Sequence, residues 1–195
     1  MLRQQLVAVS VIAAAWSAAP AGAGWSTDPT VNSPVCLADG FQKTFPESAV
    51  TDGFHGAIVV WVHEPTNPDI WAQRISAGGD ILWPFDGAPV CTAAGSQNEI
   101  RVVEDGSGGA IVVWRDRRGT DFDYWAQRID GSGQVVWPAG SPSLDGVPVC
   151  TVAGDQEAME AVSDGAGGVI VVWRNDDSVD GGVYAQRLGA DGQRL

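Results

Sequence analysis

One phrase occurs three times in this chain, and its recurrence limits the folds that are open to it. It reads DGFHGAIVVW at 52–61, DGSGGAIVVW at 105–114 and DGAGGVIVVW at 164–173, with nine residues from Asp to Trp in every copy. The copies start 53 and then 59 residues apart. Repeat periods near 50 residues are typical of propellers and of other arrays of small structural units.

Each copy is predicted to form four short strands. In the middle copy these are EIRVVE (99–104), AIVVW (110–114), DYWAQRI (123–129) and QVVWP (134–138). Asp-Gly pairs at the turns supply the backbone freedom that tight connections between antiparallel strands require. Both alternating sets of side chains in AIVVW are apolar, which predicts that both faces of this strand are covered. The two sets are Ala110, Val112 and Trp114 on one face and Ile111 and Val113 on the other.

These features predict an all-β chain of consecutive four-stranded antiparallel blades, forming a β-propeller or part of one. The repeats occupy about 25–82, 83–136 and 137–195, within one domain at 24–195. A β-sandwich is the alternative, but it does not account for a period above 50 residues. Propellers close with about four to eight blades. Three repeats are therefore expected to belong to a chain truncated after Leu195, with further blades. The alternatives are association with other copies and an open stack.

Further words recur in step with the phrase. WAQRI at 71–75 and 125–129 and YAQRL at 184–188 follow it, and a tryptophan comes next in the first two copies. The pattern DGxGGAIVVW…(W/Y)AQR…W resembles the repeat of uncharacterised secreted bacterial β-propeller-like proteins, from about Trp25 to Leu195. The resemblance implies export and a propeller-type fold, and it implies no particular activity. The first copy departs from the pattern at His55 in DGFHG, so we expect a different turn there.

The N-terminus has the composition of an export signal. Basic Met1-Leu2-Arg3 precedes an apolar run, and the small residues of Ala21-Gly22-Ala23 suit signal-peptidase cleavage. We therefore predict a signal peptide at 1–23 and an extracellular, cell-surface or periplasmic location. A membrane anchor is the alternative, but the run is short and rich in serine and alanine. No later segment is long and apolar enough to be predicted as a membrane span.

The chain is strongly acidic. It has 11 Lys and Arg against 24 Asp and Glu, a net charge of −13, which becomes −14 when Arg3 is removed with the signal peptide. This argues against a nucleic-acid ligand, which requires a basic surface, and against anionic membrane surfaces. It is compatible with solubility and with cationic or basic partners.

Residues that recur in every copy are interpreted as architectural. The aspartate of each Asp-Gly turn is expected to cap its own turn. The arginine of each AQR is expected to pair with a nearby aspartate, while the glutamine satisfies backbone groups between blades. The tryptophans are expected in the core. Cys36, Cys91 and Cys150, one in each PVC, are expected to be buried free thiols, because equivalent blade positions lie too far apart for disulfides.

The loops at the two ends of the predicted blades differ in character. First and third turns are short and glycine-rich, whereas the second loops (62–69, 115–123 and 174–182) and the blade connections (84–98 and 138–156) vary in length and content. Variable loops on a rigid scaffold are where binding usually occurs. The candidate ligand-binding residues are Arg115, Asp116, Arg117, Arg118, Asp121 and Asp123 in one loop, and Asn175, Asp176 and Asp177 in another.

These loop residues have the chemistry to hold a carboxylate, a sugar hydroxyl or, more weakly, a calcium ion, although 175–180 lacks the spacing of an EF-hand loop. The alternative is an exposed, self-neutralising charge cluster. No catalytic constellation and no site for any other cofactor or metal is visible. We therefore expect a non-enzymatic module that binds a protein or glycan. A sialidase- or glycosidase-like enzyme is one alternative, although its Asp-box spacing differs from the nine residues here. A structural spacer of an envelope protein is another.

Overall fold

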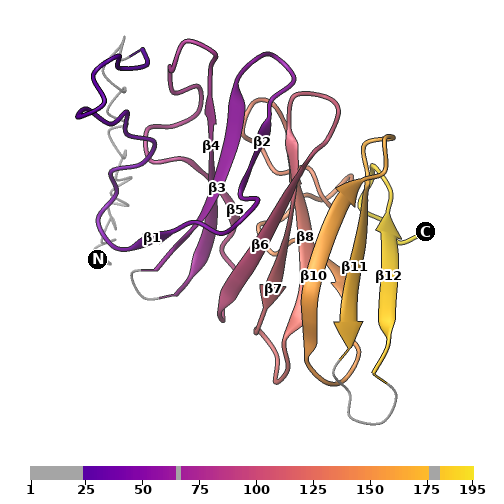
Figure 1. Ribbon diagram of the computed structural model, residues 1–195. Helices are drawn as coiled ribbons and strands as arrows, with labels where there is room; N and C mark the ends of the chain where they lie inside the picture. Colours follow the sequence, from indigo (N-terminus) through magenta and orange to yellow (C-terminus); the bar gives the residue numbers. More distant parts are fainter. Residues whose placement is uncertain (1–23, 65–66, 176–180) are drawn as a thin grey trace, which may run out of the picture.

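The computed structural model describes residues 24–64, 67–175 and 181–195, and these residues form strands and no helix. This confirms the all-β prediction (Figure 1). The strands are β1 (Gln42–Lys43), β2 (Ala49–Thr51), β3 (Ala57–His63), β4 (Asp69–Ile75), β5 (Ala88–Cys91), β6 (Gln97–Glu104), β7 (Ala110–Asp116), β8 (Asp123–Ile129), β9 (Val147–Cys150), β10 (Gln156–Ser163), β11 (Val169–Asn175) and β12 (Val183–Leu188).

The strands form three antiparallel sheets in chain order, which we name A, B and C. Sheet B has the order β6-β7-β8-β9, an up-and-down meander in which neighbours in sequence are neighbours in space. Sheet A adds one strand, because β1 and β2 both pair with β3 ahead of β4 and β5. Sheet C has β10-β11-β12 among the described residues. Four strands per copy are thus confirmed for sheet B, and none of the three sheets closes on itself.

The predicted fourth strand is wrong in position. Residues 134–138 are not a strand: Val135 makes only an isolated bridge to Ile129. The fourth strand is instead β9, which carries the PVC phrase and pairs with β8. The physical reason is that the Gln127 side chain accepts from the backbone N–H of Trp137 (3.0 Å) and donates to its carbonyl (3.2 Å). The backbone groups of Trp137 are thus satisfied without a partner strand.

The sheets are stacked face to face and share two apolar cores (Figure 1). Ala110, Val112 and Trp114 of β7 lie in the core between sheets A and B. Ile111 and Val113 lie in the core between sheets B and C. All five side chains are 0 % exposed, which confirms that β7 is covered on both faces. Sheet B is therefore the best-shielded part of the described chain.

The expectations for tryptophan and cysteine hold at most positions. Trp61, Trp83, Trp114, Trp137 and Trp173 are buried. Trp71 and Trp125 are only half-buried, and Trp25 is 57 % exposed and lies outside both cores, so the prediction fails at these three positions. All three cysteines are free thiols. Cys91 and Cys150 are buried as expected and Cys36 is half-buried, and burial raises the pKa of the Cys91 thiol to about 12.

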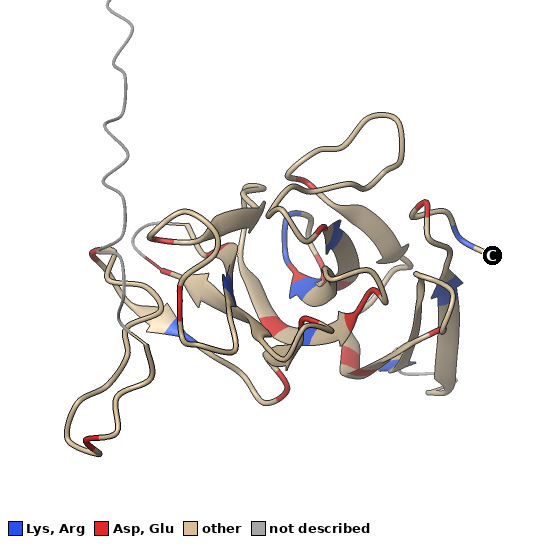
Figure 2. Ribbon diagram, turned by 90° about the horizontal axis from the view of Figure 1, so that it is seen from above, with Lys and Arg blue, Asp and Glu red and all other residues tan. Residues whose placement is uncertain are grey.

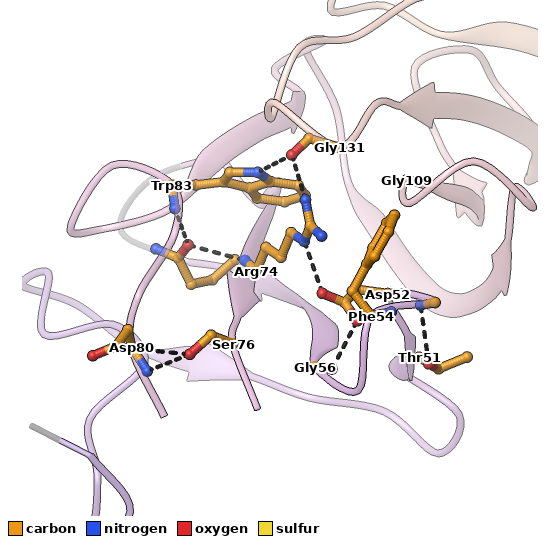
Figure 3. A network of polar contacts seen from close by, with 12 residues as sticks. Thr51, Asp52, Phe54, Gly56, Arg74, Ser76, Asp80, Trp83, Gly109 and Gly131 are labelled. Atoms are coloured by element: carbon orange, nitrogen blue, oxygen red, sulfur yellow. Dashed lines mark hydrogen bonds and ion pairs between the residues drawn. The ribbon is translucent and has the colours of Figure 1, made fainter. Parts of the chain in front are cut away.

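Each Asp-Gly aspartate caps its own turn, as expected. Asp52 Oδ1 accepts the N–H groups of Phe54 (2.8 Å) and Gly56 (2.7 Å), and Asp52 Oδ2 accepts Arg74 Nε at 2.9 Å (Figure 3). Asp105 and Asp164 make the same contacts in their own copies. The expected difference in the first turn is therefore wrong. His55 adopts φ 69°, a positive value where the other copies have glycine.

The same arginines also reach the neighbouring sheet. Arg74 donates from Nη1 to the carbonyl oxygen of Gly131 at 2.9 Å, and Trp83 Nε1 donates to the same oxygen at 3.1 Å (Figure 3). Arg128 and Trp137 repeat this arrangement on the carbonyl of Ala190, at 3.2 and 2.8 Å. One interaction thus links a turn, the third strand of its sheet and the next sheet in the stack.

The glutamines have a more local role than expected. Gln73 Nε2 donates to the carbonyl of Pro84 at 2.6 Å, and Gln73 Oε1 accepts from the backbone N–H of Trp83 at 3.0 Å. Both partners lie in the segment that leads into β5 of the same sheet. The prediction that glutamine satisfies backbone groups between blades is therefore wrong, because the arginine is the residue that makes this connection.

Two glycines with the same φ of 72° separate backbone strain from packing. A Cβ on Gly146 would lie 2.5 Å from Trp114 Cη2, whereas a Cβ on Gly106 would meet nothing within 4 Å. We expect Gly106→Ala to cost about 1–2 kcal/mol from φ alone. Gly146→Ala should cost a further 1–3 kcal/mol, roughly the cost of overpacking. Urea denaturation measures both, and equal losses would contradict the proposed contact.

The capped turn at Asp52 predicts a loss of stability in acid. Burial opposes ionisation of Asp52, but the N–H of Phe54, the Arg74 guanidinium and the N–H of Gly56 outweigh it and lower its pKa. A carboxyl group whose pKa is lower in the folded state than in the unfolded state stabilises the fold. This contribution is fully present above the unfolded-state pKa of about 3.9, and it is lost as the pH falls through the folded-state pKa. Thermal unfolding followed from pH 7 into this range should show the decline. Asp52→Asn should make the decline in melting temperature shallower. Asp39→Asn should leave the decline unchanged, because Asp39 is exposed.

Candidate functional site

The second loops and the blade connections lie at the same end of the stack, as the sequence predicted. Asp121, in the loop between β7 and β8, accepts the N–H of Gly154 at 3.1 Å, and Asp155 accepts the N–H of Phe122 at 3.0 Å. Gly154 and Asp155 belong to the connection between β9 and β10. The charged loop, which we define as residues 115–123, is therefore fixed to its neighbour by hydrogen bonds from backbone N–H groups to aspartate side chains.

Asp116 is a structural residue of this loop. Its side chain is 0 % exposed and accepts Trp114 Nε1 at 2.8 Å, the backbone N–H of Arg118 at 2.8 Å and Gln97 Nε2 at 3.4 Å. Arg118 pairs with it at 2.7 Å, and the Arg118 guanidinium lies 3.6 Å from the centroid of the Trp125 ring. Asp116 and Arg118 thus hold the loop on the core, and their charges are used within the protein.

Phe122 organises the remaining arginines. Arg115 lies 3.9 Å from its ring centroid and pairs with Glu99 at 3.4 Å. Arg117 lies 5.1 Å from the same ring and is exposed, and its backbone N–H donates to Ser96. Within the described part of the chain, Arg117 is the arginine of the charged loop without an ion pair. Its guanidinium is therefore oriented by an aromatic ring and open to an external acceptor.

The two remaining carboxylates of the charged loop are partly buried. Burial raises the pKa of Asp123, and the nearby carboxylates of Asp121 and Asp116 raise it further. This crowding of like charges is the local setting that a cation would relieve. However, among the residues that the structure describes, no three His, Cys, Asp or Glu side chains are placed to hold a metal ion. The arrangement of the described residues in this loop therefore does not support the weak prediction of a calcium site.

The second predicted loop is only partly described. Asn175 ends β11, lies opposite Gln156 and donates its backbone N–H to the carbonyl of Gly182 at 3.2 Å. Asp176 and Asp177 lie outside the described residues. The structure therefore brings the six candidates of the charged loop together, and it places Asn175 in a different sheet.

Sequence reasoning missed hollows at the opposite end of the stack. One, of about 280 Å³, lies between the Asp-Gly turns of sheets A and B and includes Phe54 and Ser107 in its lining. Another, of about 490 Å³, lies between the turns of sheets B and C, beside Arg128 and Gly165. The carboxylates at these turns, Asp52 and Asp105, are already paired. No signal in a single repeat reveals these hollows, because each is formed by two neighbouring copies.

Charge does not mark out a second site. Seen from above, acidic positions are spread over all three sheets, with fewer basic positions among them (Figure 2). The described residues contain no helix of the length and apolarity needed to cross a membrane. No protein-family model and no curated protein sequence matches the chain. The charged loop is thus identified by its own geometry alone.

Asp116 should be the most costly carboxylate to remove from this loop. Asp116→Ala leaves Arg118 and Trp114 Nε1 without their acceptor, and we expect a loss of about 3–5 kcal/mol in the free energy of unfolding. Asp121→Ala removes one hydrogen bond and should cost only about 0.5–1.5 kcal/mol. Urea denaturation of both variants provides the comparison, and a smaller loss for Asp116→Ala would contradict the structural role.

Proposed function

We propose that the chain is a propeller-type repeat scaffold of an exported protein, and that it acts as a non-enzymatic binding module through its varied-loop end. Three observations support the scaffold: the meander order of sheet B, the face-to-face stacking, and the recurrence of one inter-sheet contact. Rigid scaffolds that carry varied loops commonly serve recognition. The apolar start of the chain supports export.

The observation that carries the binding proposal is the state of Arg117. The other two arginines of the charged loop have carboxylate partners, Glu99 for Arg115 and Asp116 for Arg118. Arg117 is exposed and is held beside Phe122. Guanidinium groups favour carboxylates through charge-assisted, bidentate hydrogen bonds. We therefore propose a ligand that carries carboxylate groups, such as an acidic polysaccharide or an acidic peptide segment. Such a ligand contacts the Arg117 guanidinium at short range, while physiological salt screens its repulsion from the net charge of −13 beyond about 8 Å.

Arg117→Ala is the direct test of this function. We expect the chain to bind polygalacturonate or poly-L-glutamate but not neutral dextran, as measured by biolayer interferometry. Loss of one charge-assisted hydrogen bond should weaken binding by about tenfold or more. Lys43→Ala is the matched control, because Lys43 is also an exposed cation beside a phenylalanine ring, 4.6 Å from Phe45. Equal losses in the two variants would show that binding is not located at the charged loop.

Two other outcomes would replace the proposed function. Turnover of chromogenic glycosides that disappears in Asp121→Asn or Asp123→Asn variants would make the chain a carbohydrate-active enzyme. Absence of any ligand, together with no effect of charged-loop variants on adhesion, would support a structural spacer. The choice between polygalacturonate and poly-L-glutamate separates a glycan partner from a protein partner.

A further inference from the structure

Sheet C differs from its neighbours at one edge. In sheets A and B, the third strand is covered by a fourth strand, which carries the PVC phrase. In sheet B this pairing places Tyr124 opposite Cys150 and Trp125 opposite Pro148. The equivalent third strand of sheet C is β12, and no described strand pairs with its outer edge. An uncovered edge leaves backbone N–H and C=O groups free to pair with another chain.

A further copy of the fourth-strand phrase lies near the start of the described chain. The segment 25–36 begins with a tryptophan and ends with Pro34-Val35-Cys36, as 83–91 and 137–150 begin with Trp and end with PVC. In the structure, 25–36 forms no strand and pairs with no strand. Two of its apolar residues are open to solvent, with Trp25 57 % and Val31 55 % exposed, while Val35 and Cys36 are half-buried. Segment 25–36 thus has the sequence of a fourth strand but belongs to no sheet, while sheet C has no fourth strand among the described residues.

Trp25 already occupies the position that this interpretation requires. The indole of the tryptophan ahead of each fourth strand donates to the third turn of the next sheet. Trp25 Nε1 makes the same bond to sheet A, where it reaches the carbonyl of Ala77 at 2.8 Å. The three acceptors are equivalent positions of the repeat: Ala77, Gly131 and Ala190. Segment 25–36 therefore starts on sheet A at the place where a preceding sheet would deliver its tryptophan.

The two outer faces of the stack are complementary. Ile111 and Val113 of sheet B pack in the core shared with sheet C, and their equivalents on the outer side of sheet C are Ile170 and Val172. Ile170 and Val172 are only partly buried, and nearby Val162 is 57 % exposed. At the other end of the stack, sheet A presents the face that is equivalent to the one of sheet C that packs on sheet B. Each outer face thus has the residue pattern of a face that the inner sheets already pack together.

The polar contact is also incomplete on sheet C. Arg74 and Arg128 each use Nη1 to bond a carbonyl of the following sheet, and their side chains are 16 % and 18 % exposed. The equivalent Arg187 pairs with Asp164 in the same way, but its side chain is 46 % exposed. A groove of about 450 Å³ beside β12 includes Trp173, Tyr184 and Gln186 in its lining. Sheet C therefore presents an unused donor, an apolar face and an open groove together.

We propose that a second copy of this chain docks head to tail on sheet C, and that its segment 25–36 pairs with β12 as the missing fourth strand. Two copies that exchange this segment form a ring of six sheets, which lies in the range of about four to eight blades at which propellers close. A head-to-tail interface that closes gives a ring rather than a filament. The proposal rests on the propeller-type scaffold proposed above and is independent of ligand binding.

The repeat gives the register of this pairing. The pairing of Tyr124 with Cys150 in sheet B, carried over to sheet C, places Val183 of one copy opposite Cys36 of the other. Directly opposite residues in antiparallel strands lie about 4.5–5.5 Å apart at Cα, which is suitable for a disulfide. Val183 is 78 % exposed in the described chain. Because 25–36 and β12 lie at opposite ends of the stack (Figure 1), the crosslink forms between copies.

Val183→Cys tests the proposal directly. After mild oxidation with diamide, we expect a covalent dimer on a non-reducing gel that disappears when Cys36→Ser is added. Ser141→Cys is the control, because Ser141 is an exposed loop residue with no predicted place at the interface. Light scattering of the unaltered chain should give twice the mass of one chain, and Trp25→Ala should shift it toward the monomer while circular dichroism stays unchanged.

Several results would overturn the proposal. A monomer throughout a dilution series of the unaltered chain would mean that another segment or another partner covers β12. Equal crosslinking of the Val183→Cys and Ser141→Cys variants would indicate random collision of thiols. A growing series of oligomers in place of a dimer would show that the interface does not close. Arg117→Ala should weaken ligand binding without changing the mass of the dimer. Failure of the binding proposal can therefore be told apart from failure of the dimer proposal.

Discussion

The hydrogen-bonded pair between the Asp-Gly aspartate and the AQR arginine is the interaction on which the stack depends. The aspartate is almost fully buried and closes its own turn, while the arginine joins that turn to the third strand and to a carbonyl of the next sheet. Buried ion pairs contribute little net stability, since desolvation offsets their attraction. Their value here is geometric, because the arginine that pairs with the aspartate also donates to a carbonyl of the next sheet, and a sheet shifted along its neighbour loses that hydrogen bond.

The apolar faces then convert this local geometry into a stack. Strand β7 contributes one set of apolar side chains to the core on each side of it, so its central residues 110–114 have no polar face. A unit of this kind cannot be stable alone, because one or both of its apolar faces would be exposed to water. The same reasoning applies to the outer sheets. The partly exposed apolar face of sheet C and the unpaired segment 25–36 are therefore the parts of the described chain that most need a partner.

The charged loop contains residues of two kinds, those paired within the protein and one that is exposed to solvent. Asp116 and Arg118 look like binding residues in the sequence, yet their charges neutralise each other against Trp114 and Trp125. Arg117, between them in the sequence, faces solvent beside Phe122. The sequence predicted the loop correctly as the charged, varied segment, and the structure separates it into residues that hold the loop and a residue that is free to act. Successive side chains point to opposite sides of the chain where β7 ends, so Asp116 and Arg118 pair against the core while Arg117 faces solvent.

From the sequence alone, the repeat determined the strand content, the turn chemistry and the two-sided burial of β7, because these depend on residues close together in the chain. The tertiary structure decided what depends on which backbone groups each polar side chain reaches. It moved the fourth strand from 134–138 to the PVC phrase, since the Gln127 side chain satisfies Trp137. It also showed that arginine, rather than glutamine, links the sheets. Such choices depend on which backbone groups find partners once the sheets have formed and stacked, and the pattern of residue types does not show this.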